Sequence, residues 1–346
     1  MPRGAALGRA RLTPLLWIAA QFALCALLIL ASGVRLSRYG DVIAEKTGLG
    51  GTWTGLVLMA AVTSLPELIT GVSAMTLYNV PDIAAGDAIG SCMFNLAILA
   101  FLDARHPHPL SAHIHQGHVL SAGFGVLLLA LTALAILAGD RAPAIGWIGL
   151  HSLAFLVIYG FAVRTIFIFE RQRMAQLAEE LTGEIRYRDF TLARATTLYL
   201  ANAAVLVAAA AYLPGVAEQF STATGLDQSV VGSLLVAAST SLPEIVVSVA
   251  AARMGAYDMA VANLFGSNLF NIAVIGIDDI VYTRGSLLAS VSPVHLATLG
   301  AAMAMTAIAI IGLTFRAQRK RYRLSWESIG ILACYGIGIV LLRALS

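Results

Sequence analysis

The segment AVTSLPELITGVSA, Ala61 to Ala74, places a proline and a glutamate in the middle of a long apolar stretch. Pro66 has no N–H to donate, and its ring pushes away the carbonyl four residues earlier, so we expect a helix to break here. Glu67 follows directly and is the only formal charge of the stretch. The segment ASTSLPEIVVSVA, Ala238 to Ala250, repeats this arrangement with a proline before Glu244. An acid at a helix break in an apolar environment is therefore expected twice.

The composition indicates an integral membrane protein. Of 346 residues, 59% are hydrophobic and only 12% are charged, whereas a soluble domain carries roughly twice that share of charge. A soluble fold of this size cannot hide so much apolar surface, so the excess must face lipid. The net charge of +3 is small and spread over loops, which argues against a nucleic-acid partner. The three cysteines lack metal-like spacing and indicate no disulfide framework.

Apolar runs of about 20 residues, the length needed to cross a bilayer as a helix, occur ten times. The expected fold is an all-α membrane protein with about ten transmembrane helices. The first run is too long for a signal peptide and has no cleavage site after it. The runs are 13–33, 53–77, 83–102, 118–138, 144–167, 192–213, 228–252, 257–277, 290–315 and 326–344.

The positive charges predict an orientation. Most of the 22 Lys and Arg residues fall in the loops after every odd-numbered span, and the positive-inside rule places those loops in the cytoplasm. Three arginines before the first span argue the other way. We expect both termini outside, a cytoplasmic linker at 169–190 and a location in the cell (inner) membrane.

Two inner loops have unusual compositions. HPHPLSAHIHQGH, His106 to His118, holds five of the seven histidines; we expect a solvated loop, with metal binding or pH sensing as the alternative. RAQRKRYR, Arg316 to Arg323, is a basic run beside a span and is expected to contact anionic lipid headgroups.

The chain contains an internal duplication. TSLPE at 63–67 returns at 240–244, and GDAIGSCMFNLAIL at 86–99 returns as ANLFGSNLFNIAVI at 262–275. Matched elements this far apart indicate two repeats, which we place at 1–168 and 191–346. Each repeat holds five spans, so the second must run through the membrane inverted. Inverted repeats with broken helices at the midplane are a transporter architecture, with the ion site where the copies meet.

The two glutamates predict the ion site. An intramembrane carboxylate costs at least ~2.5 kcal/mol at a helix centre and is by default functional. Nearby hydroxyls could by themselves satisfy the carbonyls that lose their hydrogen bonds at the prolines. They would be those of Thr63, Ser64, Thr240 and Ser241. This role does not explain why an acid follows each proline. Carboxylates with carbonyl, hydroxyl and amide oxygens form the cage that Ca²⁺ prefers.

The downstream motif supplies further oxygen ligands. Ser91 and Asn95 are four residues apart and share a helix face, as do Ser267 and Asn271. The glycine before each serine lets neighbouring helices approach closely, and each Asn could alternatively bridge helices. Asp87 lies one turn before Ser91. It is either an entry carboxylate or a solvated residue near the start of its helix.

Two inverted copies of T-S-L-P-E followed by G-S-x-x-x-N resemble the alpha repeats of the cation/Ca²⁺ exchanger superfamily, the sodium/calcium exchangers. The resemblance implies one central site that alternately binds Ca²⁺ or Na⁺ and faces either side of the membrane. It implies that the site is lined by Ala60, Thr63, Ser64, Glu67, Ser91, Asn95, Ala237, Thr240, Ser241, Glu244, Ser267 and Asn271.

The chain departs from the family pattern at three positions. Cys92 replaces an Asn, Asp87 stands where a G-N motif is usual, and Asn271 stands where many members have Asp. The central cage then carries only the charges of Glu67 and Glu244, unless Asp87 reaches it. One Ca²⁺ or two monovalent cations would neutralise those two charges equally. This predicts coupling that is close to electroneutral.

The expected function is a secondary antiporter that exchanges Ca²⁺, or a similar hard cation, for Na⁺ by alternating access. A cation/proton exchanger with the same site is the main alternative. An ion channel would also suit a polar core, and GD at 86–87 and YD at 257–258 are only faintly similar to the motifs of an intramembrane protease. Broken helices with midplane acids favour alternating access. We expect no enzymatic activity, no cofactor beyond the transported Ca²⁺, Na⁺ or H⁺, and no obligate protein partner besides the bilayer.

Overall fold

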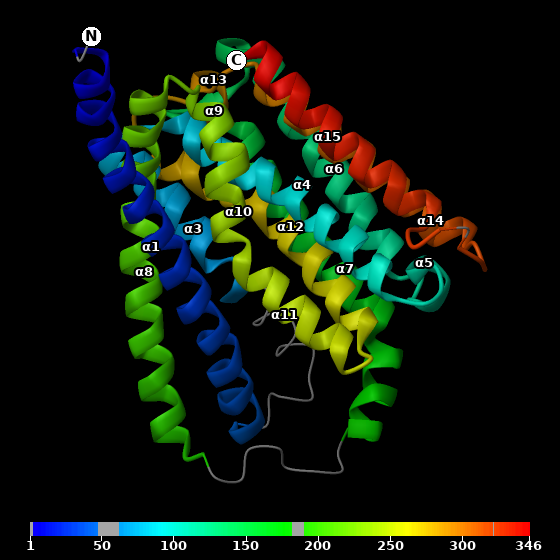
Figure 1. The fold of residues 1–346 in the computed structure, drawn as a ribbon. Coiled ribbons are helices and arrows are strands. Elements are labelled where there is room, and N and C mark those ends of the chain that lie inside the picture. Colours follow the sequence, from blue (N-terminus) through cyan, green and yellow to red (C-terminus); the bar gives the residue numbers. More distant parts are fainter. Residues whose placement is uncertain (1–2, 48–61, 182–189, 321) are drawn as a thin grey trace.

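The computed structural model describes residues 3–47, 62–181, 190–320 and 322–346 as a bundle of long helices (Figure 1). Two short strands form the only sheet in these ranges, an antiparallel pair. The elements are α1 (Arg3–Lys46), α3 (Leu65–Ser73), η1 (Ala74–Tyr78), α4 (Pro81–Arg105), α5 (Leu110–His113), α6 (His118–Ala138), η2 (Gly139–Arg141), β1 (Ala144–Ile145), β2 (Ile148–Gly149), α7 (Leu150–Leu181), α8 (Leu192–Thr224), α9 (Gln228–Val230), η3 (Val231–Val236), α10 (Ala237–Thr240), α11 (Leu242–Arg253), α12 (Tyr257–Val281), α13 (Leu287–Ser290), α14 (His295–Phe315) and α15 (Trp326–Leu345).

The long helices confirm the membrane assignment. Within the described ranges, eight helices are long and apolar enough to cross a membrane, and the bent pair of α10 and α11 makes a ninth. They coincide with nine of the ten expected spans. The tenth, 53–77, begins in residues 48–61, which lie outside the described ranges. The span expected at 144–167 begins later, at Leu150, because the preceding residues form the strand pair.

Both expected helix breaks are present. Ser64 and Ser241 leave helical geometry, with φ/ψ of −92°/10° and −84°/7°, and a new helix starts directly after each. Each of these new helices carries its proline in the first two positions, where a missing N–H is tolerated. The pair in the second repeat bends by 44° at the break. The two acids therefore lie in the first turns of α3 and α11.

The helices α4 and α12 form the centre of the bundle and are the most buried spans. They cross behind α10 and α11 in Figure 1, whereas α1 and α8 lie side by side along one flank. Gly90 of α4 sits against the backbone of Ser233 in η3, and a Cβ at Gly90 would collide with the Ser233 carbonyl oxygen. The close approach expected at Gly90 is confirmed.

Two histidine–aspartate pairs tie the repeats together at their ends. His295 Nε2 lies 3.1 Å from Asp82 Oδ1, and His118 Nε2 lies 3.1 Å from Asp258 Oδ1. Each aspartate begins a central helix, and each histidine begins a helix of the other repeat. Because Asp82 and Asp258 hold corresponding positions in the two copies, the duplication extends well beyond the motifs.

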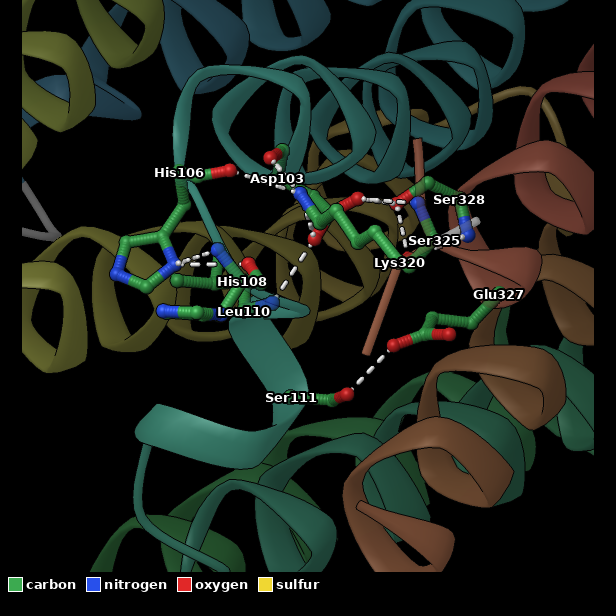
Figure 2. Close-up of polar contacts among 9 residues, drawn as sticks. All are labelled: Asp103, His106, His108, Leu110, Ser111, Lys320, Ser325, Glu327 and Ser328. Carbon is green, nitrogen blue, oxygen red and sulfur yellow. Dashed lines mark hydrogen bonds and ion pairs between the residues drawn. The ribbon is translucent and has the colours of Figure 1, made fainter. Parts of the chain in front are cut away.

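Another corresponding pair, Asp103 and Asp279, anchors loops near the ends of α4 and α12. Asp279 accepts hydrogen bonds from the backbone N–H groups of Gly149, at 2.8 Å, and Leu287, at 2.5 Å. Figure 2 shows Asp103 at the centre of a larger cluster. It accepts bonds from the backbone of Leu110 and Ser325 and from the Ser328 hydroxyl, and it pairs with Lys320 Nζ at 3.0 Å.

This cluster corrects the expectation for part of the basic run. The Lys320 side chain is only 5% exposed and also donates to the backbone carbonyls of Asp103 and His106. Arg316 donates to the carbonyl of Ala112 at 2.6 Å. Both cations hold the loop before α15 against the histidine-rich segment, and Lys320 faces the protein interior instead of lipid headgroups. Within that segment, His118 is buried, so the expectation of a fully solvated loop is wrong at its end.

Candidate cation site

Each serine at a helix break donates a hydrogen bond to the glutamate of the opposite repeat. Ser64 Oγ donates to Glu244 Oε1 at 3.2 Å, and Ser241 Oγ donates to Glu67 Oε1 at 3.1 Å. All four side chains are at most 1% exposed. Because every hydroxyl crosses to the other repeat, the two breaks and the two acids form one polar centre at the repeat interface.

The serines of α4 and α12 extend this centre. Ser91 Oγ lies 3.0 Å from Ser241 Oγ, within hydrogen-bonding distance, and Ser267 donates to Glu244 Oε1 at 3.4 Å. Both Ser91 and Ser267 are fully buried. The structure thus brings together the serines and glutamates that the sequence motifs single out.

The two threonines, Thr63 and Thr240, bond to a pair of corresponding residues on the central helices, Asn263 and Asp87. Thr240 Oγ1 donates to Asp87 Oδ1 at 2.7 Å, and Thr63 Oγ1 donates to Asn263 Oδ1 at 3.4 Å. Asp87 is 1% exposed. The alternative that Asp87 is a solvated residue at a helix start is therefore wrong. The helix begins six residues earlier, and η3 packs over it where Gly86 meets Gly232.

The asparagines join α4 to α12. Asn95 Nδ2 donates to Asn268 Oδ1 at 3.0 Å, and Asn268 Nδ2 donates to the Cys92 carbonyl at 3.2 Å. Asn95 thus bridges helices, as the alternative interpretation allows, while its own Oδ1 is buried without a hydrogen bond. Asn271 is fully buried beside Cys92, and neither polar atom of its amide has a partner at normal hydrogen-bond distance and angle.

Ala60 lies outside the described residues. Its counterpart Ala237 is fully buried, and its carbonyl accepts from the Ser241 N–H at 3.1 Å and lies 3.2 Å from Thr240 Oγ1. That carbonyl therefore lies at the helix break, beside two hydroxyls of the polar centre.

The polar centre contains several buried oxygen atoms that receive no hydrogen bond from any donor. Buried oxygens without a hydrogen-bond partner are expensive in a protein interior and require an explanation. Bound hard cations are one, since they take carboxylate, hydroxyl and amide oxygens together. No three His, Cys, Asp or Glu side chains converge on one point anywhere in the described part of the chain, so a cation here would rely on neutral oxygens as well. The acceptor atoms are Glu67 Oε2, Asp87 Oδ2, Asn95 Oδ1, Glu244 Oε2 and Asn271 Oδ1.

One buried acid of this region was missed by the sequence reasoning. Asp278 lies on α12 two turns after Asn271 and is 1% exposed. The expected span 257–277 stops just before it, which places the residue at a solvated helix end. The helix continues to Val281, which keeps Asp278 inside the bundle.

Fold and site together define a helical membrane transporter built from two inverted repeats, not an enzyme. The family model described as sodium/calcium exchanger protein matches residues 17–168 and 195–343. The chain therefore belongs to the sodium/calcium exchanger protein family.

The chain is also similar to a membrane protein in sequence and to two exchangers in fold. The inner membrane protein YrbG of Escherichia coli (strain K12) is 28% identical over 270 residues, which cover 75% of this chain and 81% of the relative. The sodium-calcium exchanger NCX_Mj has a similar fold, with a TM-score of 0.57 at 22% identity over 94% of this chain and 98% of that chain. The H⁺/Ca²⁺ exchanger CAX gives a TM-score of 0.68 at 15% identity over 95% and 86%.

Proposed function

We propose that this chain is a secondary antiporter that moves Ca²⁺, or a similar hard cation, against Na⁺ by alternating access. Membership of the sodium/calcium exchanger family supports cation exchange. The observation that carries the proposal is the reciprocal pairing of Ser64 with Glu244 and of Ser241 with Glu67. It places two acids and their hydroxyls at the interface between inverted repeats, where transporters bind their substrate.

In this proposal Glu67 and Glu244 are the central ligands. Each presents one buried oxygen that no donor satisfies, and their charge offsets the dehydration of the cation. The hydroxyls, the amides and the carbonyl of Ala237 supply neutral oxygens. Release of the cation exposes these oxygens to water as the repeats rearrange around the fixed site.

The burial of Asp87 changes the charge count. Because Thr240 ties Asp87 to the helix break, the centre holds three acids instead of the two that near-electroneutral coupling assumes. One Ca²⁺ leaves a net charge of one if all three are ionised. Asp87 then either takes a monovalent cation of its own or remains protonated. Coupling is electroneutral when Asp87 carries the same occupant, a proton or a monovalent cation, in both half-cycles, and electrogenic when Asp87 is ionised and unoccupied while Ca²⁺ is bound.

The main alternative is a cation/proton exchanger with the same site. Asn271, which supplies an amide where many sodium/calcium exchangers have a carboxylate, favours this alternative because it leaves one negative charge fewer to offset bound Na⁺. The fold is compatible with either ion, since it is similar to that of both NCX_Mj and CAX.

We further propose that the chain resides in the cell membrane with both termini outside. The first described residue of α1 and the end of α15 lie at the same end of the bundle (Figure 1). Positive loops then face the cytoplasm, together with the 169–190 linker between the repeats 1–168 and 191–346. The protein requires the bilayer and the transported cations, but no cofactor and no obligate protein partner.

Transport by the purified full chain in proteoliposomes tests this proposal. Uptake of radioactive Ca²⁺ is measured with an outward Na⁺ gradient, an outward H⁺ gradient or neither. Uptake driven by Na⁺ supports the proposal, uptake driven only by H⁺ establishes the alternative, and uptake with neither gradient identifies a channel. Asp140→Asn is the matched control, because Asp140 is an exposed acid in a loop remote from the site.

A further inference from the structure

Asp278 is a buried carboxylate with no partner for either oxygen. It is 1% exposed, and neither Oδ1 nor Oδ2 has a hydrogen-bond partner. Its neighbour Asp279 is equally buried, yet it accepts two backbone hydrogen bonds. The two adjacent aspartates therefore have different roles. Asp279 holds loops in place through hydrogen bonds to backbone N–H groups, whereas the Asp278 carboxylate makes no hydrogen bond.

The duplication gives independent evidence that Asp278 is not required by the fold. Asp279 corresponds to Asp103 of the first repeat, which also anchors backbone N–H groups. Asp278 corresponds to Leu102, a buried apolar residue. The same architecture is thus built in the first repeat with leucine at this position, and the acid is a feature of the second repeat alone.

The Asp278 side chain points toward the helix that carries Glu67. A Cβ added at Gly71 of α3 would lie 2.6 Å from Asp278 Oδ1 and even closer to Oδ2. Gly71 follows Glu67 by four residues, about one turn or ~6 Å along the helix. On its own helix, Asp278 follows Asn271 by seven residues, which places both on one face. Asp278 therefore lies just beyond the cation site, between α3 and α12.

The electrostatic surroundings of Asp278 are acidic. Asp279 is the next residue on its own helix. The helix α4, which packs against α12, carries Asp87 and, at its two ends, Asp82, Asp103 and Arg105. The other helices packed against α12 carry Glu67 on α3, Glu244 and Arg253 on α11, His118 on α6, and His151 and Arg164 on α7. His118 is paired with Asp258. Arg164 and Arg253 are exposed, and neither oxygen of Asp278 has a hydrogen-bond partner.

An ionised carboxylate in such a place is unfavourable, because burial removes its hydration and no donor or cation replaces it. A divalent cation would need six to eight oxygens, whereas a proton needs only one. We propose that Asp278 is a proton-binding site adjacent to the cation site, loaded when the cation site is empty and released to water when Ca²⁺ binds.

The coupling follows from the like charges of Asp87 and Asp278. If Asp87 is ionised while the cation site is empty, its charge favours the protonated form of Asp278. A bound Ca²⁺ adds two positive charges beside Asp87, which favours the ionised form of Asp278 and the release of its proton. This coupling step rests on the proposed function, since it assumes that Ca²⁺ binds beside Asp87. The presence of a proton on Asp278 is independent of the proposed function.

Two measurements on the purified full chain test the proposal separately. Infrared spectroscopy detects the C=O stretch of protonated carboxyl groups, and a pH-sensitive dye in weak buffer counts the protons released when Ca²⁺ is added. Asp278→Asn should lose the infrared signal of one protonated carboxyl and release up to one proton fewer per Ca²⁺ bound. Asp140→Asn should match the natural chain in both measurements.

An infrared signal that is unchanged in Asp278→Asn would overturn the proposal. If the signal falls but proton release does not, the coupling is wrong. If the natural chain shows no response to Ca²⁺, the proposed function fails, and the infrared measurement still decides whether Asp278 carries a proton. Should Asp278→Asn fail to fold, Asp278→Ala, which is smaller and crowds Gly71 less, serves for the same measurements.

Discussion

Thr240 donates a 2.7 Å hydrogen bond to Asp87, which joins the helix break of the second repeat to the central helix of the first. The corresponding bond in the other direction runs from Thr63 to Asn263 at 3.4 Å. The two contacts join equivalent positions but differ in charge. The inverted repeats thus form a symmetric scaffold around an asymmetric distribution of acids, in which Asp87 and Asp278 are the departures from symmetry.

Neutralising either central glutamate should abolish exchange. Glu67→Gln and Glu244→Gln keep the shape of the side chain and its capacity to accept from serine, but remove the charge that stabilises a dehydrated cation. Removing one partner of a buried charge pair costs about 3–5 kcal/mol, which corresponds to a decrease in cation affinity of about a hundredfold or more. The measurement is Ca²⁺ uptake in proteoliposomes, with monodispersity confirming that each variant folds. Near-normal uptake by both variants would remove the two acids from the site.

The voltage dependence of transport should report the charge at Asp87. If Asp87 is ionised during the cycle, Ca²⁺ flux will depend on membrane potential, and Asp87→Asn will weaken that dependence. The potential is clamped with K⁺ and valinomycin while the Na⁺ gradient is held constant. A flux that is insensitive to voltage in both proteins would mean that Asp87 stays protonated and that coupling rests on the two glutamates.

Asn271→Asp provides the opposite change. Both polar atoms of the Asn271 amide are buried, and Cys92 is the neighbour that the amide contacts, so an isosteric carboxylate keeps the shape and adds one negative charge. Na⁺ dependence and voltage sensitivity should both increase if the new acid ionises. The same clamped flux assay measures both. Unchanged coupling together with normal Ca²⁺ uptake would place position 271 outside the ion path.

The sequence predicts the helix breaks, the inverted duplication and the pairing of acids with hydroxyls, because these depend on local chemistry that is repeated twice. It does not predict the contacts between repeats. His295 and Asp82 are 213 positions apart, and neither belongs to a motif. The sequence leaves the place of Asp87 open and gives no prediction for Asp278, and the reason is shared. Hydropathy places the ends of spans by composition, whereas packing of η3 on α4 and the extra turn of α12 decide which terminal acids are buried.

The orientation can be tested by labelling from each side. A cysteine at Arg319 should react with an impermeant thiol reagent only from the cytoplasm, and one at Arg141 only from outside, since the positive-inside rule assigns these exposed positions to opposite sides. Cys334 is the least buried natural cysteine, so it is first replaced by serine, and the unlabelled background is the control. Reversed labelling would invert the orientation while leaving the repeats intact.

The close contact of α4 with η3 should make Gly90 intolerant of any side chain. In Gly90→Ala the new methyl would meet the backbone of Ser233, which cannot move as a flexible side chain can. Overpacking of this kind costs about 1–3 kcal/mol, so the thermal unfolding temperature should fall and transport should weaken. Gly123→Ala is the matched control, because a Cβ there meets nothing within 4 Å, and alanine in a helix is favoured over glycine by about 1 kcal/mol. Equal unfolding temperatures for the two variants would show that α4 and η3 can separate without loss, contrary to the packing described above.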